Sequence, residues 1–362
     1  MKVLLIGDGQ LGHMLGRSAI QQGHYCLLYS TRTQQVMPLA STESLALSLA
    51  EAVAWADVVS WEHEDVPADI IELARSKFLM DPEKITALTD RRSEKQLFDD
   101  CQVPTSPWQA FENETELAKV LEQSPQALVL KAARGGYDGK GQWRWQPQQN
   151  AEPLLKSAGQ QAGIAEHLIP FEYEVSLVGA RDKQGNIRCY PLITNVHDRG
   201  ILSYSIAGEG WVSEHLQAQA ESYFESITKA LDYVGVLAIE FFVVAEGNEQ
   251  HLLVNEIAPR VHNSGHWSMS GSNCDQFGLH MRCLTGLPLP DLLCAPTLMV
   301  NVIGVETIPG ELWQAAAADC HWYNKQARPG RKLGHVNFII DTPERGRKLA
   351  EFWAPRLQQL AD

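Results

Sequence analysis

The chain contains 362 residues, of which 44% are hydrophobic and 20% charged, a composition typical of a soluble globular protein with two or three domains. Its 30 Lys and Arg against 44 Asp and Glu give a formal net charge of −14, which argues against a protein that binds nucleic acid or a membrane surface. Seven scattered cysteines without a C-x-x-C pair, and no apolar run of about 18 residues, predict a cytoplasmic protein with reduced thiols and no membrane span.

The N-terminal part of the chain follows a strand–helix–strand pattern. Short apolar runs at residues 2–7, 25–30 and 56–62 predict buried strands, and the spacing over 10–23 predicts a helix that stops at Gly23. Two strands joined by a helix within about 30 residues form a βαβ unit. We therefore expect a small, doubly wound α/β domain in this part of the chain.

After a predicted helix over 91–100 and a proline-containing boundary at 103–108, the pattern changes to α+β with antiparallel strands. A long amphipathic helix is predicted over 213–234. Alternating apolar runs around turn residues predict three hairpins, at residues 127–145, 173–193 (turn at 182–186) and 235–259.

The first of these hairpins contains a glycine-rich loop, "KAARGGYDGKGQW", from Lys131 to Trp143. It is not a Walker loop, because Arg134 stands where G-x-x-x-x-G-K requires glycine, and Gly141 follows Lys140 where Ser or Thr is required. The residues alone leave two interpretations open, a phosphate-binding loop of another geometry and a simple turn between two strands.

A second glycine pattern, G-x-G-x-x-G, is formed by Gly7, Gly9 and Gly12 between a predicted strand and helix. An NAD site also needs an acid at the end of the second strand, where this chain reads "YSTR", although Arg32 would suit the 2′-phosphate of NADP. The alternatives are a tight turn that needs small residues, or a helix N-terminus that receives a substrate phosphate.

The third hairpin predicts two opposed carboxylates. A turn centred near Asn248 sets Glu240 opposite Glu256, and like charges directly opposed on a sheet are destabilising. A hard divalent cation between them removes the repulsion, and Mg²⁺ is often held by one or two carboxylates plus substrate phosphates. The alternative is a register shifted by one residue, which sends the two to opposite faces. The same turn predicts two apolar pairs, Val244 with Leu252 and Phe242 with Val254.

Two further polar segments are candidates for anion binding. Pro259 and Gly265 break helix around "APRVHNSGHW", so His262 and His266 do not form a helical zinc pair, and a loop that receives an anion beside the metal fits better. A basic cluster near the C-terminus is either a site for an anionic substrate or a solvated basic turn; its members are Lys325, Arg328, Arg331 and Lys332.

Together these segments resemble the ATP-grasp ligases, and most closely the 5-(carboxyamino)imidazole ribonucleotide synthases among them. The resemblance is carried by "GDGQLGHML", "GGYDGKGQW", "EVSLVGAR", "NEIAPRVHNSGHW" and "HWYNKQARPGRKLGH", in this order from Gly7 to His335. It implies an ATP-grasp fold, α/β and α+β, and a homodimer. The expected domains are an N-terminal Rossmann-like (pre-ATP-grasp) domain at 1–105, a small central lid domain at 106–171 and a larger C-terminal domain at 172–362.

The resemblance also implies a reaction and its residues. Family members use ATP to join bicarbonate to the exocyclic amine of 5-aminoimidazole ribonucleotide through carboxyphosphate, with Mg²⁺ held by Glu240 and Glu256 and a lid over the phosphates at 136–142. The ATP contacts would be Arg91, Lys131, Gly136, Tyr137, Asp138, Gly139, Lys140, Gly141, Gln142, Glu166, His167, Leu168, Ile169, Glu174, His197, Asn255 and Glu256. The catalytic residues would be Arg260, His262, Asn263, Lys140 and Asp138. The ribonucleotide contacts would be Gly9, Gln10, Leu11, Tyr137, Lys325, Arg331, Lys332 and Glu62, with Glu64 the alternative to Glu62.

Two positions depart from the family pattern, since His13 and Lys140 stand where the family often has arginine. The competing interpretations are another ATP-grasp ligase (a formate-using glycinamide ribonucleotide transformylase or a biotin carboxylase), an NADP oxidoreductase, and a nucleotide-binding module without activity. The last leaves the carboxylate pair without a chemical purpose.

Overall fold

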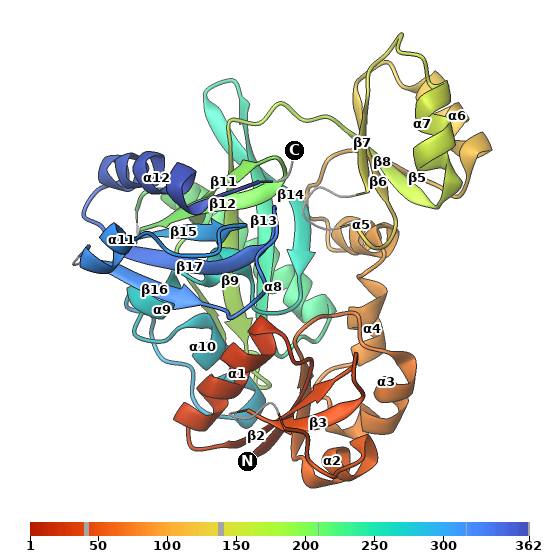
Figure 1. Cartoon of the computed structure of the whole chain (residues 1–362). Coiled ribbons are helices and arrows are strands. Elements are labelled where there is room, and N and C mark those ends of the chain that lie inside the picture. The colour runs from red at the N-terminus through yellow and green to blue at the C-terminus, as the bar shows by residue number, and fades with distance from the viewer. Residues whose placement is uncertain (40–42, 137–140, 209, 316, 361–362) are drawn as a thin grey trace.

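The computed structural model describes residues 1–362 except 40–42, 137–140, 209, 316 and 361–362. The described residues form three β-sheets, two of four strands and one of nine. In Figure 1 the N-terminal sheet lies at the bottom, one small sheet stands apart at the upper right, and the large sheet fills the centre.

The N-terminal unit is a parallel sheet with one antiparallel edge, in the order β3-β2-β1-β4. Its strands are β1 (Lys2–Ile6), β2 (Tyr25–Ser30), β3 (Gln35–Pro38) and β4 (Val58–Trp61), and its helices are α1 (Gln10–Gln21), α2 (Leu49–Trp55), α3 (Ala68–Ala74), η1 (Arg75–Lys77) and α4 (Pro82–Ala87). The central strands β1 and β2 are buried on both faces, which is why they read as continuous apolar runs. The predicted strands and helix are confirmed; β3 and the short helices were not predicted.

The small central unit is an antiparallel sheet with its own core. Its order is β5-β8-β6-β7, and α5 (Arg91–Asp100) precedes it. The elements are β5 (Trp108–Phe111), α6 (Glu114–Gln123), β6 (Leu128–Ala132), β7 (Gln142–Trp145), α7 (Glu152–Ser157), η2 (Ala158–Gln160) and β8 (Gly163–His167). Phe111, Leu117 and Leu130 are fully buried in the layer between sheet and helices. The predicted hairpin at 127–145 is confirmed, because β6 and β7 pair from Leu128–Trp145 to Lys131–Gln142.

The large sheet is antiparallel throughout, in the order β14-β13-β9-β11-β12-β15-β17-β16, with β10 paired to β9. Its strands are β9 (Tyr173–Arg181), β10 (Ile187–Cys189), β11 (Ile193–Asp198), β12 (Ile201–Ala207), β13 (Gly235–Glu246), β14 (Glu249–Ala258), β15 (Thr297–Ile303), β16 (Ala318–Trp322) and β17 (Lys332–Ile339). Its helices are α8 (Glu214–Ala230), η3 (Asn263–Gly265), α9 (Ser268–Gly271), α10 (Gln276–Thr285), α11 (Gly310–Gln314) and α12 (Pro343–Leu357). The predicted hairpins at 173–193 and 235–259 are confirmed. The long helix begins after the Ser213 cap as expected but stops four residues before the predicted end at Val234.

The pairing of β13 with β14 confirms one part of the predicted register and corrects another. The turn is tighter than expected, with Glu246 opposite Glu249, so the predicted apolar pairs are wrong by one residue: Val244 faces His251, and Phe242 faces Leu253. A β-bulge next to Glu240 then restores the register, because Asn255 has no partner on β13. Glu240 therefore does lie opposite Glu256.

Candidate functional site

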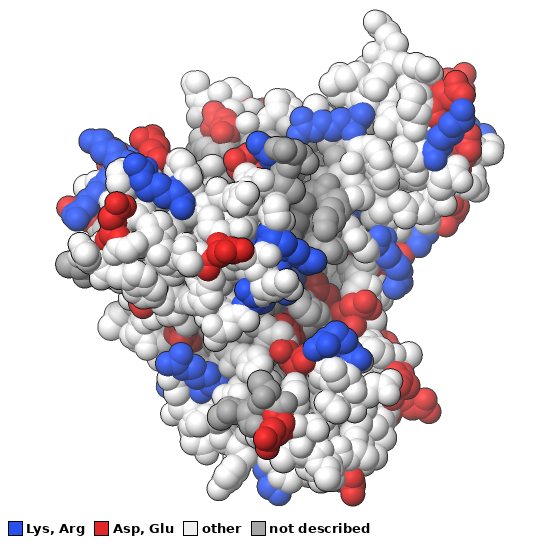
Figure 2. All heavy atoms as spheres, viewed as in Figure 1, with Lys and Arg blue, Asp and Glu red and all other residues white. Residues whose placement is uncertain are grey.

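The candidate site lies where all three sheets approach one another. Contributions come from the first turn of α1, the start of α5, the strand β6, the middle of β13 and β14, and the segments at 260–263 and 323–332. Figure 2 shows Lys, Arg, Asp and Glu gathering around the hollow between the N-terminal unit and the large sheet, near the middle of the view. The site therefore depends on segments that are far apart in the sequence.

The carboxylate pair is partly exposed to solvent and asymmetric. The side chains of Glu240 and Glu256 are 17% and 38% exposed, and the Arg91 guanidinium donates from Nη1 to Glu256 Oε2 at 3.1 Å. Loss of hydration in the cleft and the charge of Glu256 raise the pKa of Glu240 to about 8. The same loss of hydration opposes ionisation of Glu256, but Arg91 and Lys131 outweigh it and lower its pKa. A cation between the two would remove the repulsion that keeps Glu240 protonated.

A buried ion triad lies beside the carboxylate pair. Glu166 on β8 is within 2.5 Å of two ammonium groups, Lys95 Nζ through Oε1 and Lys131 Nζ through Oε2. Lys131 also donates to Asn255 Oδ1 at 3.1 Å, and Lys95 donates to the Asn255 carbonyl at 3.1 Å and to Thr105 Oγ1 at 2.7 Å. Asn255, the bulged residue of β14, thus contacts both lysines. Lys95 is 1% exposed, and sequence analysis missed it, although its place one helical turn after Arg91 was a usable signal.

A histidine–carboxylate pair flanks the same face of the sheet. Glu174 Oε2 on β9 lies 2.6 Å from His197 Nδ1 on β11. Burial alone would lower the pKa of His197, but the bond to Glu174 and the charge of Glu240 raise it. The structure thus places both predicted nucleotide contacts on neighbouring strands, next to the carboxylate pair.

The first turn of α1 is occupied by a carboxylate of the chain itself. Glu62 accepts hydrogen bonds from Gly9 N at 2.6 Å and Leu11 N at 3.2 Å. A Cβ atom at Gly9 would lie 2.2 Å from Glu62 Oε1, and one at Gly7, where φ is +124°, would lie 2.5 Å from Glu62 Cβ. These glycines are therefore required by the close approach of Glu62. An anion at this helix N-terminus would meet that carboxylate, which argues against the pyrophosphate and substrate-phosphate interpretations of the pattern.

The second acidic candidate has a different partner. Glu64 Oε2 accepts a hydrogen bond from Arg260 Nε at 2.6 Å. Glu62 therefore binds the first turn of α1, and Glu64 holds the arginine of the polar segment.

His262 lies two residues after Arg260, and its Nε2 is 3.5 Å from Glu240 Oε1. Burial and then the charge of Arg260 lower the pKa of His262 well below its usual range. Asn263 Oδ1 is buried without a hydrogen-bond partner among the described residues.

The basic cluster contacts the N-terminal unit. Lys325 Nζ donates to Gln10 Oε1 at 3.0 Å, and the Gln10 amide nitrogen lies 3.1 Å from His266 Nε2. Burial and the charge of Arg331 lower the pKa of Lys325. Arg331 donates to the Gln326 carbonyl at 3.0 Å. Lys325 and Arg331 are close enough to interact, and Lys325 is tied to α1, which favours a site over a solvated turn.

The glycine-rich loop is only partly within the described residues. Gly136 accepts from Arg91 Nη2 at 3.1 Å, Gly141 has a φ of +64°, and Gln142 pairs with Lys131 across the hairpin. Tyr137, Asp138, Gly139 and Lys140 lie outside the described residues. His167 ends β8, and Leu168 and Ile169 follow it in the connection to β9.

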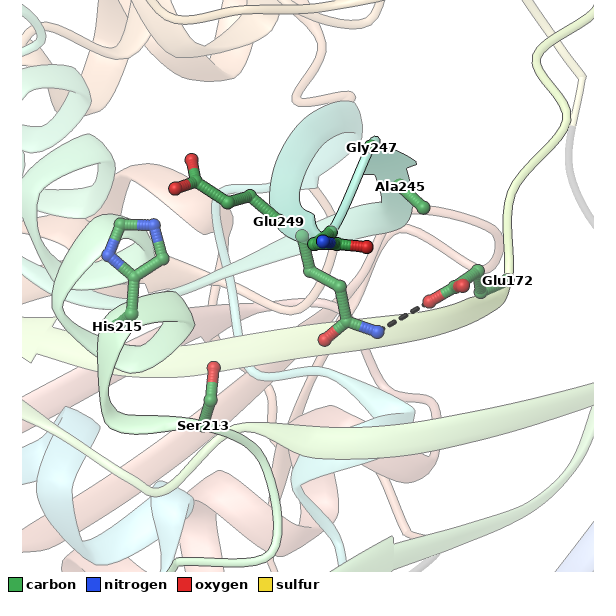
Figure 3. A pocket seen from close by; sticks show the side chains of 8 residues that line it. Glu172, Ser213, His215, Ala245, Gly247 and Glu249 are labelled. Atoms are coloured by element: carbon green, nitrogen blue, oxygen red, sulfur yellow. Dashed lines mark hydrogen bonds between the residues drawn. The ribbon is translucent and has the colours of Figure 1, made fainter.

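A separate cavity of about 530 Å³ lies at the tip of the β13–β14 hairpin (Figure 3). Its lining includes Glu172, Ser213, His215 and Glu249, and the Gln250 amide donates to the Glu172 carboxylate across it. None of the predicted site residues that the structure describes lines this cavity.

Most of the chain matches two known protein families. Residues 96–277 match the ATP-grasp domain family, and residues 297–348 match the phosphoribosylaminoimidazole carboxylase C-terminal domain. The chain is 40% identical over 351 residues to an N5-carboxyaminoimidazole ribonucleotide synthase of Vibrio vulnificus, covering 94% of this chain and 91% of that protein. It is 37% identical over 358 residues to the Escherichia coli protein of the same name, covering 98% and 95%.

Solved structures agree with these matches. The synthetase from Thermus thermophilus has a TM-score of 0.85 at 34% identity and covers 98% of each chain. A synthase from Aspergillus clavatus, solved in complex with ADP and 5-aminoimidazole ribonucleotide, has a TM-score of 0.82 at 26% identity and covers 98% of each chain. Among the described residues, no helix has the length and apolar character needed to cross a membrane.

Proposed function

This chain belongs to the N5-carboxyaminoimidazole ribonucleotide synthase family of ATP-grasp ligases, and we propose on this premise that it carboxylates 5-aminoimidazole ribonucleotide at the expense of ATP. The co-substrate is bicarbonate, the products are N5-carboxyaminoimidazole ribonucleotide, ADP and phosphate, and the reaction is a step of purine biosynthesis. The observation that carries the assignment is the opposed pair Glu240–Glu256, with Arg91 and Lys131 beside it and His262 3.5 Å from Glu240.

ATP binds between the small central sheet and the large sheet. Lys131 and Arg91 face its phosphates, since both cations already lie at the carboxylate pair. The Glu174–His197 pair and the connection at 168–169 face the nucleoside. Glu240 and Glu256 would hold Mg²⁺, which fits the raised pKa of Glu240, and the ion would neutralise charge on the phosphate oxygens. Among the described residues no group of three or more Cys, His, Asp and Glu side chains could hold a metal, so the two carboxylates would hold Mg²⁺ together with substrate phosphates.

The chain's own residues then act on bicarbonate. A bicarbonate oxygen attacks the γ-phosphorus of ATP, the bond to the β–γ bridging oxygen breaks, and carboxyphosphate and ADP form. Arg260, held by Glu64 at 2.6 Å, and the His262 side chain bind the developing anion. The amine of the ribonucleotide attacks the carboxyl carbon, phosphate leaves and the nitrogen loses a proton. Water must be excluded throughout, because carboxyphosphate hydrolyses readily.

The ribonucleotide lies between the first turn of α1 and the basic cluster. Gly9, Gln10 and Leu11 line one side of it, with Glu62 bound to the same turn. Lys325, Arg331 and Lys332 bind its 5′-phosphate, since Lys325 already bridges to Gln10. The domain boundaries expected from the sequence at 105/106 and 171/172, a homodimeric assembly and a cytoplasmic location belong to the same proposal.

The test is phosphate release from ATP with and without 5-aminoimidazole ribonucleotide and bicarbonate. We expect turnover that needs both co-substrates; release stimulated by formate or biotin would instead favour another ATP-grasp ligase.

Removing one proposed metal ligand tests the carboxylate pair. Glu256→Gln should abolish ATP turnover while the protein stays folded, and Glu240→Gln should act similarly. Glu249→Gln, at the far end of the same hairpin, is the matched control and should behave as wild type. Near-normal turnover of Glu256→Gln at saturating Mg²⁺ would remove the metal assignment.

A further inference from the structure

A row of buried polar side chains crosses the large sheet and ends at His262. Ser205 Oγ donates to Asn195 Oδ1 at 2.7 Å, and Asn195 Nδ2 donates to Ser176 Oγ at 2.8 Å. Ser176 Oγ donates to Ser264 Oγ at 2.9 Å, and Ser264 Oγ lies 3.0 Å from His262 Nδ1. The first four residues are at most 4% exposed. Such positions on a central sheet are normally apolar, so the row needs an explanation.

The row lies on the same face as the carboxylate pair. Ser176 on β9 pairs directly with Glu240 on β13, and Asn195 on β11 pairs with both Glu174 and Ser205. Directly paired residues of antiparallel strands point to the same side of a sheet. The polar row therefore continues from the nucleotide-facing carboxylates into the interior of the protein.

The hydrogen bonds in this row can run in only one direction. The backbone N–H of Ser264 also donates to His262 Nδ1, at 3.3 Å, so Nδ1 must carry a lone pair. Ser264 Oγ then gives its own hydrogen to Nδ1, and it must accept from Ser176, which in turn accepts from the Asn195 amide. If the bonds ran in the opposite direction, Nδ1 would carry a proton, and two N–H donors, Nδ1–H and the Ser264 backbone N–H, would point at each other.

The His262 backbone is also fixed. Gln276 is fully buried; its Oε1 accepts from His262 N at 2.8 Å and its Nε2 donates to the His262 carbonyl at 2.7 Å. The His262 backbone is therefore held at both its amide and its carbonyl, and the ring is oriented by the contacts of Nδ1 with Ser264.

We propose that Ser264, Ser176 and Asn195 are positioning residues that fix His262 as the Nε2–H tautomer, so that it acts as a hydrogen-bond donor and not as a base. The part of this inference that concerns bicarbonate rests on the proposed function. Nε2 points into the site, 3.5 Å from Glu240 Oε1, and an N–H there suits an oxygen of bicarbonate or carboxyphosphate. A lone pair at the same position would repel that oxygen. By fixing the tautomer, the polar row makes the contact between His262 Nε2 and that oxygen attractive.

The tautomer is tested directly by ¹⁵N spectra of protein labelled at histidine, with the His262 signals identified by their loss in His262→Asn. We expect a pyridine-type Nδ1 and a pyrrole-type Nε2 in the free enzyme. Ser264→Ala keeps only the longer 3.3 Å bond from the backbone N–H to Nδ1, so its Nδ1 and Nε2 signals should shift towards their common average as the preference for this tautomer weakens. A pyrrole-type Nδ1 in the wild type, or an unchanged spectrum in Ser264→Ala, would overturn the proposal. This measurement needs no substrate, so it stands even if the carboxylation assay fails.

Steady-state kinetics test whether the tautomer of His262 affects the use of bicarbonate. Ser264→Ala and Ser176→Ala should raise the KM for bicarbonate by about two- to twelvefold, the range of one hydrogen bond, and leave the KM for ATP unchanged. The matched control is Ser60→Ala, whose hydroxyl lies 3.2 Å from the buried His280 Nε2 while Val236 N donates to His280 Nδ1 at 3.0 Å. It should change neither constant. If Ser264→Ala changes the KM for bicarbonate no more than Ser60→Ala does, the row is only structural. The same conclusion follows if Ser264→Ala raises the KM for ATP instead.

Discussion

Glu166→Gln is the perturbation whose cost the structure defines best. The carboxylate lies within 2.5 Å of Lys95 Nζ and Lys131 Nζ, and its side chain is 5% exposed. Glutamine keeps the shape of the side chain but leaves two ammonium groups facing a neutral amide in a buried place. Breaking a buried ion pair from one side is among the most destabilising single changes.

The magnitude follows from the pKa of the carboxyl group. Burial alone would raise the pKa of Glu166, but Lys131 and Lys95 lower it from an ordinary 4.5 to about 2. The difference, 4.5 − 2 = 2.5, corresponds to about 3 kcal/mol at about 1.36 kcal/mol per pH unit. Because the pKa of the folded state lies below that of the unfolded state, this contribution is complete above pH 4.5 and is lost as the pH falls towards 2.

The assay is urea unfolding of wild type and variant at pH 7 and again near pH 3.5. We expect Glu166→Gln to lower the free energy of unfolding by about 3 kcal/mol at pH 7, with the difference shrinking by roughly 1 kcal/mol at the lower pH. Glu152→Gln is the matched control, since Glu152 lies at the same 2.5 Å from Lys156 Nζ but both side chains are more than 60% exposed. It should cost at most about 0.5 kcal/mol. Equal costs for the two variants would refute the argument from burial.

Two further predictions concern ligand binding. Arg331→Ala should weaken use of the ribonucleotide by roughly 10- to 150-fold, because one charge-assisted bond to phosphate is lost, while the KM for ATP stays constant; steady-state kinetics with each substrate varied in turn decides it, with Arg345→Ala on α12 as the control. A defect confined to ATP would contradict the phosphate clamp. Lys131→Ala should raise the KM for ATP and lower turnover, yet destabilise the protein less than Glu166→Gln, because Lys95 still balances Glu166; unchanged ATP kinetics would place the nucleotide elsewhere.

Sequence reasoning performed well where one local pattern decides one element. The buried strands of the N-terminal sheet and the three hairpins have periodicities that survive in any tertiary context. The opposition of Glu240 and Glu256 was predicted from a pairing register that was one residue out near the turn, and a bulge at Asn255 compensated for the error. The apolar pairs nearer the tip were wrong because the turn is tighter than expected, and the bulge was not foreseen because it inserts its extra residue without a recognisable sequence signal.

Contacts between segments distant in sequence could not be predicted from the sequence. Lys95 reads as an ordinary helical lysine until β8 brings Glu166 against it, and Ser176 reads as a polar residue in a strand until η3 brings Ser264 beneath it. These pairs are 71 and 88 positions apart, and no local periodicity links them. The glycine pattern shows the same limit, because its meaning depends on Glu62, which follows it in the chain only after three further strands.

The carboxylate at the first turn of α1 has a consequence for how such chains are classified. Spacing of glycines reports that some group comes very close to the backbone, and it says nothing about whether that group is a ligand or a side chain. A search that scores Gly7, Gly9 and Gly12 alone would place this protein among the dehydrogenases. One extra position, an acid directly after β4 in contact with Gly9 N and Leu11 N, would separate turns that are already filled from turns that remain free for a nucleotide.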